Sequence, residues 1–330
     1  MARRPAGSGR RAGCAGLLSL LAVGIAAVWL VSSWGGPGPA RQNVTVDVPR
    51  GATLASAAAE LEKAGVIPSA RRFRLLARLL GGHGAIRAGE YRILAHLSQS
   101  DILKLLQGGR TLQRFVTIPE GLPSVLAQEV VAKAPELTST VAVPPEGSLL
   151  PDSYSYSHGD TRASVVKRMQ GAMDRYLAAA WAHRKPGLVV TTPRQALILA
   201  SVVEKETGKA AERRTVAAVY ANRLRVGMPL QADPTVIYPV TQGRPLGRRI
   251  LQSELHAKNG YNTYASPGLP AGPICNPGRA SIDAVLDPAA SKALYFVADG
   301  TGGHVFADTL AQHNANVKRW YAIRHARGEM

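Results

Sequence analysis

The chain has 330 residues, a formal net charge of +18 and a pI near 10.4. This length suggests two modules rather than a single core. Aromatic residues make up only 5% of the chain, and no basic run interleaves with them, so the composition argues against a nucleic-acid-binding protein. The dispersed charge is typical of a solvated, arginine-rich surface. Attraction to the membrane surface and to carboxylates of a substrate would come in addition.

An uncharged segment from Cys14 to Trp34 lies near the N-terminus. As a helix it would be roughly 31 Å long, which is enough to cross a bilayer core. The arginine-rich residues 1–13 before it predict a cytoplasmic tail, with the rest of the chain exported. We expect a single-pass anchor in the cell (inner) membrane. The alternative is a cleaved signal peptide, although Ser32 to Gly36 is a mediocre cleavage site.

A Gly/Pro-rich linker is predicted over 35–42, followed by a small module over 43–118. Its predicted order is strand, helix, helix, strand, at 43–48, 54–64, 69–80 and 89–94. This layout resembles a LysM-type module, a small glycan-binding unit; an ordinary α+β spacer is the alternative. A further helix over 100–107 and a strand over 111–118 complete the module.

A mixed α+β domain is predicted over 119–330. Two strands over 293–298 and 303–307 form a hairpin, and residues 227–278 are predicted to be loops rich in Pro, Gly, Asn and Tyr. The predicted helices cover 122–134, 161–183, a segment from Pro193, 213–225, 281–286 and 310–324. Together with the N-terminal segments, the predicted fold class is α+β: a transmembrane helix, a LysM-like βααβ module and a mixed α+β domain. Cys14 and Cys275 would lie in different compartments, so no disulfide framework is expected.

The helix from Pro193 carries the most informative carboxylate. Thr192 is its predicted N-cap, and Gln195 completes a capping box. Glu204 falls at the border of the apolar stripe, whereas Glu206 points to a different side. A carboxyl held against apolar surface has its charged form disfavoured, which a general acid requires. The alternative is an ordinary helix-border glutamate in a salt bridge with Lys205, Lys209 or Arg213.

Several ordered sequence blocks resemble the MltG/YceG-like family of endolytic murein transglycosylases. The strongest are Ala200 to Thr207 (A-S-V-V-E-K-E-T) and Asn222 to Tyr238, which includes Q-A-D-P-T-V-I-Y. Y-N-T-Y from Tyr261, G-L-P-A-G-P-I-C-N-P-G from Gly268 and H-V-F-A-D-T-L-A-Q-H-N from His304 continue the pattern in the same order. Two departures are Pro239, where the family usually has Gly, and the run Ser148-Leu-Leu before Pro151.

This resemblance implies that Glu204 is the catalytic general acid and base of a lytic transglycosylase. Such an enzyme cleaves the MurNAc–GlcNAc bond of nascent peptidoglycan and leaves a 1,6-anhydro-MurNAc end. One carboxylate suffices, because the C6 hydroxyl of muramic acid is the nucleophile. The resemblance also implies work beside cell-wall synthases such as penicillin-binding proteins. The competing interpretation is a non-enzymatic peptidoglycan-binding scaffold, with a zinc amidase as a more distant one.

Polar and aromatic residues in the loops after 227 are candidates for sugar binding, since amides, hydroxyls and ring faces are what sugar sites use. Asp233 is the best candidate for a second carboxylate, but it fits a turn or helix cap as well. His304, His313, Asp308 and His256 match no metal-binding motif, so neither a metal nor any other cofactor is expected. The candidate substrate-binding residues are Gln231, Asp233, Thr235, Tyr238, Tyr261, Asn262, Tyr264 and Asn276.

Overall fold

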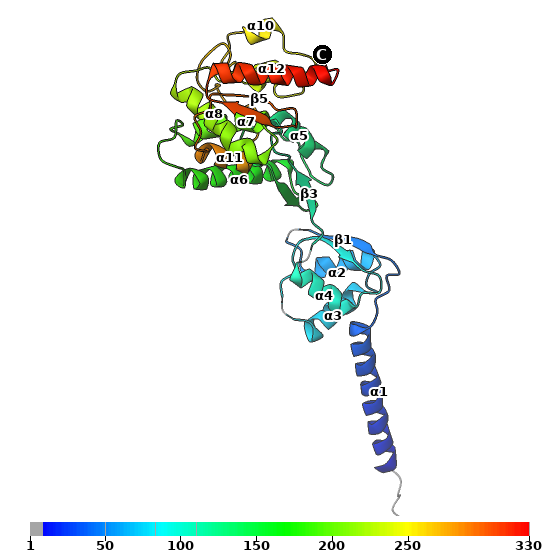
Figure 1. The fold of residues 1–330 in the computed structure, drawn as a ribbon. Coiled ribbons are helices and arrows are strands. Elements are labelled where there is room, and N and C mark those ends of the chain that lie inside the picture. Colours follow the sequence, from blue (N-terminus) through cyan, green and yellow to red (C-terminus); the bar gives the residue numbers. More distant parts are fainter. Residues whose placement is uncertain (1–8, 50, 83, 110, 330) are drawn as a thin grey trace, which may run out of the picture. The chain divides into compact units, whose positions relative to one another are not determined.

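The computed structural model describes residues 9–49, 51–82, 84–109 and 111–329 (Figure 1). The chain divides into two compact units, Met1–Arg114 and Phe115–Met330. Both helices and short strands occur, and the three sheets have two strands each among the described residues. The predicted mixed α+β class is confirmed.

The first unit is built around a strand pair. β1 (Val44–Val48) pairs antiparallel with β2 (Gly89–Ile93), with Val46 opposite Tyr91. Between them lie α2 (Leu54–Lys63) and α3 (Ala70–Leu80), and α4 (Gln99–Gly108) follows. The core of this unit includes Leu61, Phe73, Leu76, Tyr91 and Ile102. The strand–helix–helix–strand order predicted for the module is therefore present, while its identity as a LysM-type unit stays a prediction.

The first helix, α1 (Gly9–Gly35), covers the segment predicted as an anchor. Residues 1–8 of the predicted basic tail lie outside the described residues, as do the side chains of 9–19, 26 and 27. Over the part of the chain that is described, no helix has both the length and the apolar character that crossing a membrane demands. The last turn of α1 packs on the module, where the Trp34 ring lies 5.7 Å from that of Phe73.

The segment predicted as a linker also contacts the first unit. The Gly38 amide donates to the His96 carbonyl at 3.1 Å, and the His96 amide donates to the Ala40 carbonyl at 2.8 Å. A Cβ on Gly38 would lie 2.3 Å from the Leu97 carbonyl oxygen, so only glycine fits. Residues 38–40 are therefore held against the module by backbone hydrogen bonds.

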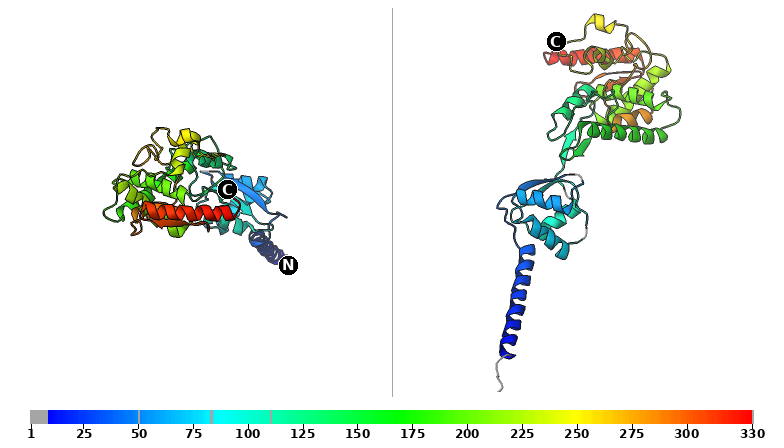
Figure 2. Two further views of the ribbon diagram at one scale, coloured as in Figure 1. Left: turned by 45° about the horizontal axis from the view of Figure 1, so that its top comes forward. Right: turned by 180° about the vertical axis from the view of Figure 1, so that it is seen from behind.

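Helices dominate the second unit. α11 (Arg279–Leu286) packs against α6 (Arg162–Ala182), α7 (Pro193–Glu206) and α8 (Arg213–Arg225). These helices surround one large core, and α5 (Ser124–Lys133) contributes to a second core with Tyr156. Figure 2 shows this group of helices from two further directions. The buried face of α7 therefore lies at the centre of the unit.

Short strands complete the second unit. β5 (Tyr295–Ala298) and β6 (His304–Ala307) form the predicted hairpin, and α12 (Leu310–Ala326) packs against it. β3 (Arg114–Thr117) pairs with β4 (Ser153–Tyr156), a strand that the sequence did not predict.

Two helices occupy part of the segment expected to be loop. α9 (Asp233–Thr241) contains Pro239, and α10 (Gln252–Leu255) is a single turn. Proline inside a helix normally interrupts it, which is why the pattern predicts loop here. α9 nevertheless forms, because Pro234 fits its first turn and α7 packs against it.

Candidate active site

The helix α7 begins and packs almost as its sequence predicts. Thr192 is the N-cap, and its hydroxyl accepts from the Gln195 amide at 3.1 Å. The Gln195 side chain instead accepts from the Thr191 amide at 2.7 Å, so the predicted capping box is only half formed. An apolar face from Ala196 to Val203 is buried, and the helix ends at Glu206. Its two glutamates therefore lie in the last turn of a firmly held helix.

Glu204 accepts hydrogen bonds at the N-terminus of another helix, α11. Its side chain is only 7% exposed, and its Oε2 accepts from the Gly278 amide at 3.0 Å and from the Ser281 hydroxyl at 2.6 Å. Arg213 lies 4.0 Å away, which is one of the salt bridges that the sequence left open. A carboxylate at a helix N-terminus stabilises the unpaired amides there. Glu204 thus joins α7 to the first turn of α11.

Glu206 points to a different side of α7 and lines a cavity of about 480 Å³. The pKa of Glu206 is raised to about 7: burial is the main cause and the nearby charge of Asp233 adds to it, while a hydrogen bond from Tyr220 and the charge of Arg223 oppose the shift. A carboxyl with this pKa is protonated in a large fraction of molecules near neutral pH. The other residues that line the cavity are Lys205, Tyr220, Arg223, Leu230, Gln231, Asp233, Pro234, Tyr264, Phe296 and His313.

Three of the predicted substrate-binding residues meet at this cavity: Gln231, Asp233 and Tyr264. The Tyr264 hydroxyl donates to Asp233 Oδ1 at 2.6 Å. Asp233 is the first residue of α9, and Ala232 occupies the N-cap position. The carboxylate of Asp233 therefore lies in the first turn of α9 and also lines the cavity.

Three other predicted residues are buried and hold loops together. Thr235 Oγ1 lies 2.8 Å from Thr263 Oγ1. Asn262 Nδ2 donates to the carbonyls of Glu254, Leu255 and Ala257, and the Asn276 side chain bonds Leu122, Ser124 and Leu149. All three are at most 1% exposed. These three side chains therefore serve structural contacts within the loops, and their role in sugar binding stays a prediction.

Tyr238 and Tyr261, the remaining pair, line a second cavity of about 340 Å³. Their ring centroids lie 4.9 Å apart. The second cavity shares α9 and the loop 261–264 with the first.

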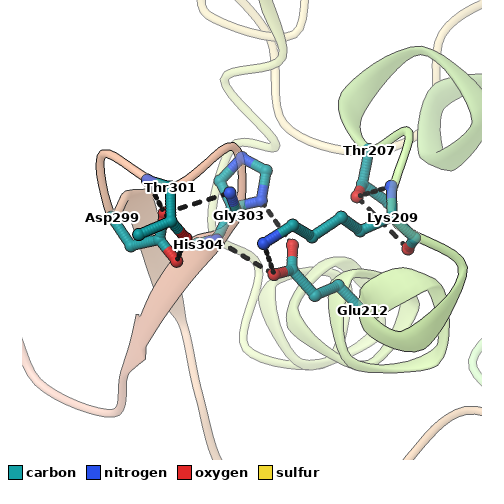
Figure 3. Close-up of polar contacts among 7 residues, drawn as sticks. All are labelled: Thr207, Lys209, Glu212, Asp299, Thr301, Gly303 and His304. Atoms are coloured by element: carbon teal, nitrogen blue, oxygen red, sulfur yellow. Dashed lines mark hydrogen bonds and ion pairs between the residues drawn. The ribbon is translucent and has the colours of Figure 1, made fainter.

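One side of the Glu206 cavity is formed by Phe296 of β5 and His313 of α12. A polar clamp fixes the β5–β6 turn (Figure 3): Asp299 Oδ1 accepts from the Thr301 and Gly303 amides, and Glu212 accepts from both the amide and the ring of His304. Glu212 immediately precedes α8. The clamp therefore ties the hairpin that carries Phe296 to the α7–α8 connection.

The remaining candidates from the sequence serve other contacts. His304 pairs with Glu212 at 2.7 Å, and the His313 ring stacks on Tyr295. No group of three or more His, Cys, Asp or Glu residues with metal-binding geometry occurs in the described ranges. Cys275 is fully buried, and burial raises the pKa of its thiol. A buried thiol of this kind is a poor nucleophile.

Comparison with known proteins identifies the family. The family described as YceG-like matches residues 46–319. The chain belongs to the YceG-like family. This matched range begins in β1 and includes every residue that lines the Glu206 cavity.

Curated relatives of this YceG-like chain carry an enzyme name. A Bacillus subtilis (strain 168) protein named endolytic murein transglycosylase is 29% identical over 318 residues, which cover 86% of this chain and 87% of the relative. A Streptococcus pneumoniae (strain D39) protein of the same name is 31% identical; 84% of this chain matches 58% of that longer protein. The crystal structure of a YceG-like protein from Listeria monocytogenes aligns with a TM-score of 0.52 at 27% identity, covering 83% of this chain and 98% of the other.

Sequence reasoning does not single out Glu206, Tyr220, Arg223 or Phe296 of the YceG-like chain. It places Glu206 on a different side of α7 from Glu204, as the structure does, but it gives no sign of the cavity on that side. The sequence does contain a signal that points to Glu206: it lies in the same family block as Glu204, and Asp233 lies in the next block.

Proposed function

We propose that this chain is a lytic transglycosylase that cleaves the MurNAc–GlcNAc bonds of peptidoglycan, with Glu206 as general acid and base. The observation that carries the proposal is the placement of Glu206 in a cavity with Asp233 and Tyr264, with its pKa raised to about 7. Glu204, the residue expected from the sequence, already accepts two hydrogen bonds on one oxygen at the start of α11. The names of the bacillar and streptococcal relatives support the reaction class.

A single carboxylate can perform both steps of this reaction. Protonated Glu206 donates its proton to the glycosidic oxygen as the bond from that oxygen to C1 of muramic acid breaks. The resulting Glu206 carboxylate then takes the proton of the C6 hydroxyl, whose oxygen bonds to C1. The products are a 1,6-anhydro-MurNAc end and a free GlcNAc hydroxyl, and no water is consumed.

Asp233 supports both steps through its charge. A carboxylate near Glu206 keeps that group protonated before the reaction, since two like charges disfavour each other. The same negative charge stabilises the positive charge that develops at C1. The Tyr264 hydroxyl, which donates to Asp233 at 2.6 Å, fixes the orientation of this carboxylate.

We extend the proposal to the location of the enzyme. Residues 14–34 would anchor the chain in the cell membrane with the N-terminus in the cytoplasm, and the βααβ module would hold glycan near that membrane. The uncharged segment and the arginines before it support the anchor. Peptidoglycan strands are the proposed partner, with cell-wall synthases as proposed neighbours.

Product analysis tests the proposal. Full-length wild-type protein, Glu206→Gln and Glu204→Gln would be incubated with isolated peptidoglycan, and the products identified by mass spectrometry. We expect anhydro-muropeptides from wild type and from Glu204→Gln, but none from Glu206→Gln. Loss of activity in Glu204→Gln alone would return the acid role to Glu204. Released peptides would indicate an amidase, and unchanged glycan a scaffold.

A further inference from the structure

The second cavity lies at the other end of α9 and has no role in the proposed chemistry. Its volume is about 340 Å³. Two tyrosine rings, those of Tyr238 and Tyr261, meet there at 45°. Its other lining residues are Ser124, Val125, Val143, Pro144, Glu146, Pro239 and Gln242.

The two cavities take lining residues from the same helix and the same loop. Pro234 and Tyr238 lie four residues apart on α9, so they occupy the same face of the helix about 6 Å apart along its axis. Pro234 lines the Glu206 cavity and Tyr238 the second one. Likewise Tyr264 and Tyr261, three residues apart in one loop, line the first and the second cavity. Both cavities therefore lie along α9 and this loop.

The carboxylate at the second cavity is already satisfied by the protein. Glu146 Oε1 accepts from the Ser124 amide at 2.8 Å, and Oε2 accepts from the Tyr238 hydroxyl at 3.2 Å. What remains for a ligand is the faces of the two rings, the apolar side chains and the amide of Gln242.

The side chains that line the second cavity limit which ligands it can bind. In a chain of net charge +18, its lining includes no lysine or arginine. A carboxylate-bearing ligand, such as the peptide stem of peptidoglycan, would find no cation there. Ring faces instead suit the apolar face of a pyranose, and a side-chain amide suits an acetamido group.

We propose that the second cavity is a glycan subsite, which binds an N-acetylated hexose of the same strand whose scissile bond lies beside Glu206. This inference rests on the proposed function of the Glu206 cavity. A substrate that fills both cavities gains binding energy that a short end fragment lacks. The subsite would therefore favour cleavage within long strands.

The kinetic test compares long glycan strands with a MurNAc–GlcNAc disaccharide, which holds the scissile bond and no further sugar. Tyr261→Ala in the full-length protein should lower kcat/KM on long strands roughly tenfold more than on the disaccharide, which corresponds to about 1.4 kcal/mol of lost contact. Tyr321→Ala is the matched control, because Tyr321 is 51% exposed on α12 and lines neither cavity. Equal losses on both substrates, or no loss, would overturn the subsite.

A binding test separates this inference from the proposed chemistry. Glu206→Gln and Glu206→Gln/Tyr261→Ala would be titrated with uncleaved strands, with and without their stem peptides. Weaker binding of the double variant to both kinds of strand supports a glycan subsite, even if wild type proved inactive. An effect only on strands that carry peptides would reassign the cavity to the peptide stem. Equal binding of the two variants would refute the subsite.

Discussion

The raised pKa of Glu206 makes a quantitative prediction about stability. Its pKa lies at about 7, against an ordinary value of 4.5. A difference of one in pKa corresponds to about 1.4 kcal/mol, so ionising this carboxyl costs the folded state about 3 kcal/mol. Because the folded pKa is raised, the contribution of Glu206 to stability is fully present below pH 4.5 and is lost as the pH rises through 7.

Glu206→Gln removes this titration while keeping the shape of the side chain. Relative to the variant, wild type should therefore lose about 3 kcal/mol of stability between about pH 4.5 and pH 8. For a unit of this size the difference in melting temperature should grow by roughly 6–12 °C. Calorimetry of both full-length proteins at several pH values measures it. If the difference in melting temperature between the two proteins stays constant over this pH range, Glu206 does not titrate near neutrality. The proposed acid role would then lose its main support.

The same geometry sets the expected outcome of four other experiments. The kcat/KM of wild type should fall as the pH rises through about 7, since the acid loses its proton; a flat profile up to about pH 9 would contradict this. Glu204→Gln should lower stability by about 1–2 kcal/mol, measured by thermal unfolding, because it weakens the contacts with Gly278 and Ser281, yet it should keep most of the activity. Asp233→Asn should move the high-pH limb of the activity profile to lower pH, because it removes a negative charge beside Glu206; an unchanged limb would refute the coupling. Incubation with EDTA should leave activity unchanged, and inactivation that zinc reverses would contradict a mechanism without metal.

The family blocks are visible in the sequence because each one is local. The cap at Thr192, the apolar face of α7 and the β5–β6 hairpin all follow from the spacing of neighbouring residues, and the structure confirms them. The helix α9 is not predicted from the sequence, because a local pattern takes no account of packing. Its Pro239 argues locally against a helix, whereas packing of α7 against α9 favours one.

The loop residues show where local patterns stop being informative. One stretch of the chain contains four polar or aromatic candidates, Gln231, Thr235, Asn262 and Tyr264, and their spacing does not show which of them reach the cavity. Their burial in the structure does show it. Thr235 and Asn262 use their polar atoms to bond other loops, whereas Gln231 and Tyr264 face the cavity. The partners of Asn276 lie more than 120 residues away along the chain.

The sequence by itself determined the helix, its two glutamates and the family to which they belong. Only the tertiary structure decided the surroundings of the two glutamates. Positions two apart on a helix lie about 200° from each other, so they meet different neighbours. α11 covers the side of Glu204 and occupies its carboxylate, while Asp233, Tyr264 and Phe296 leave a cavity beside Glu206. The elements that pack on each side come from distant parts of the chain, so no local pattern within α7 can encode which carboxyl lines a cavity.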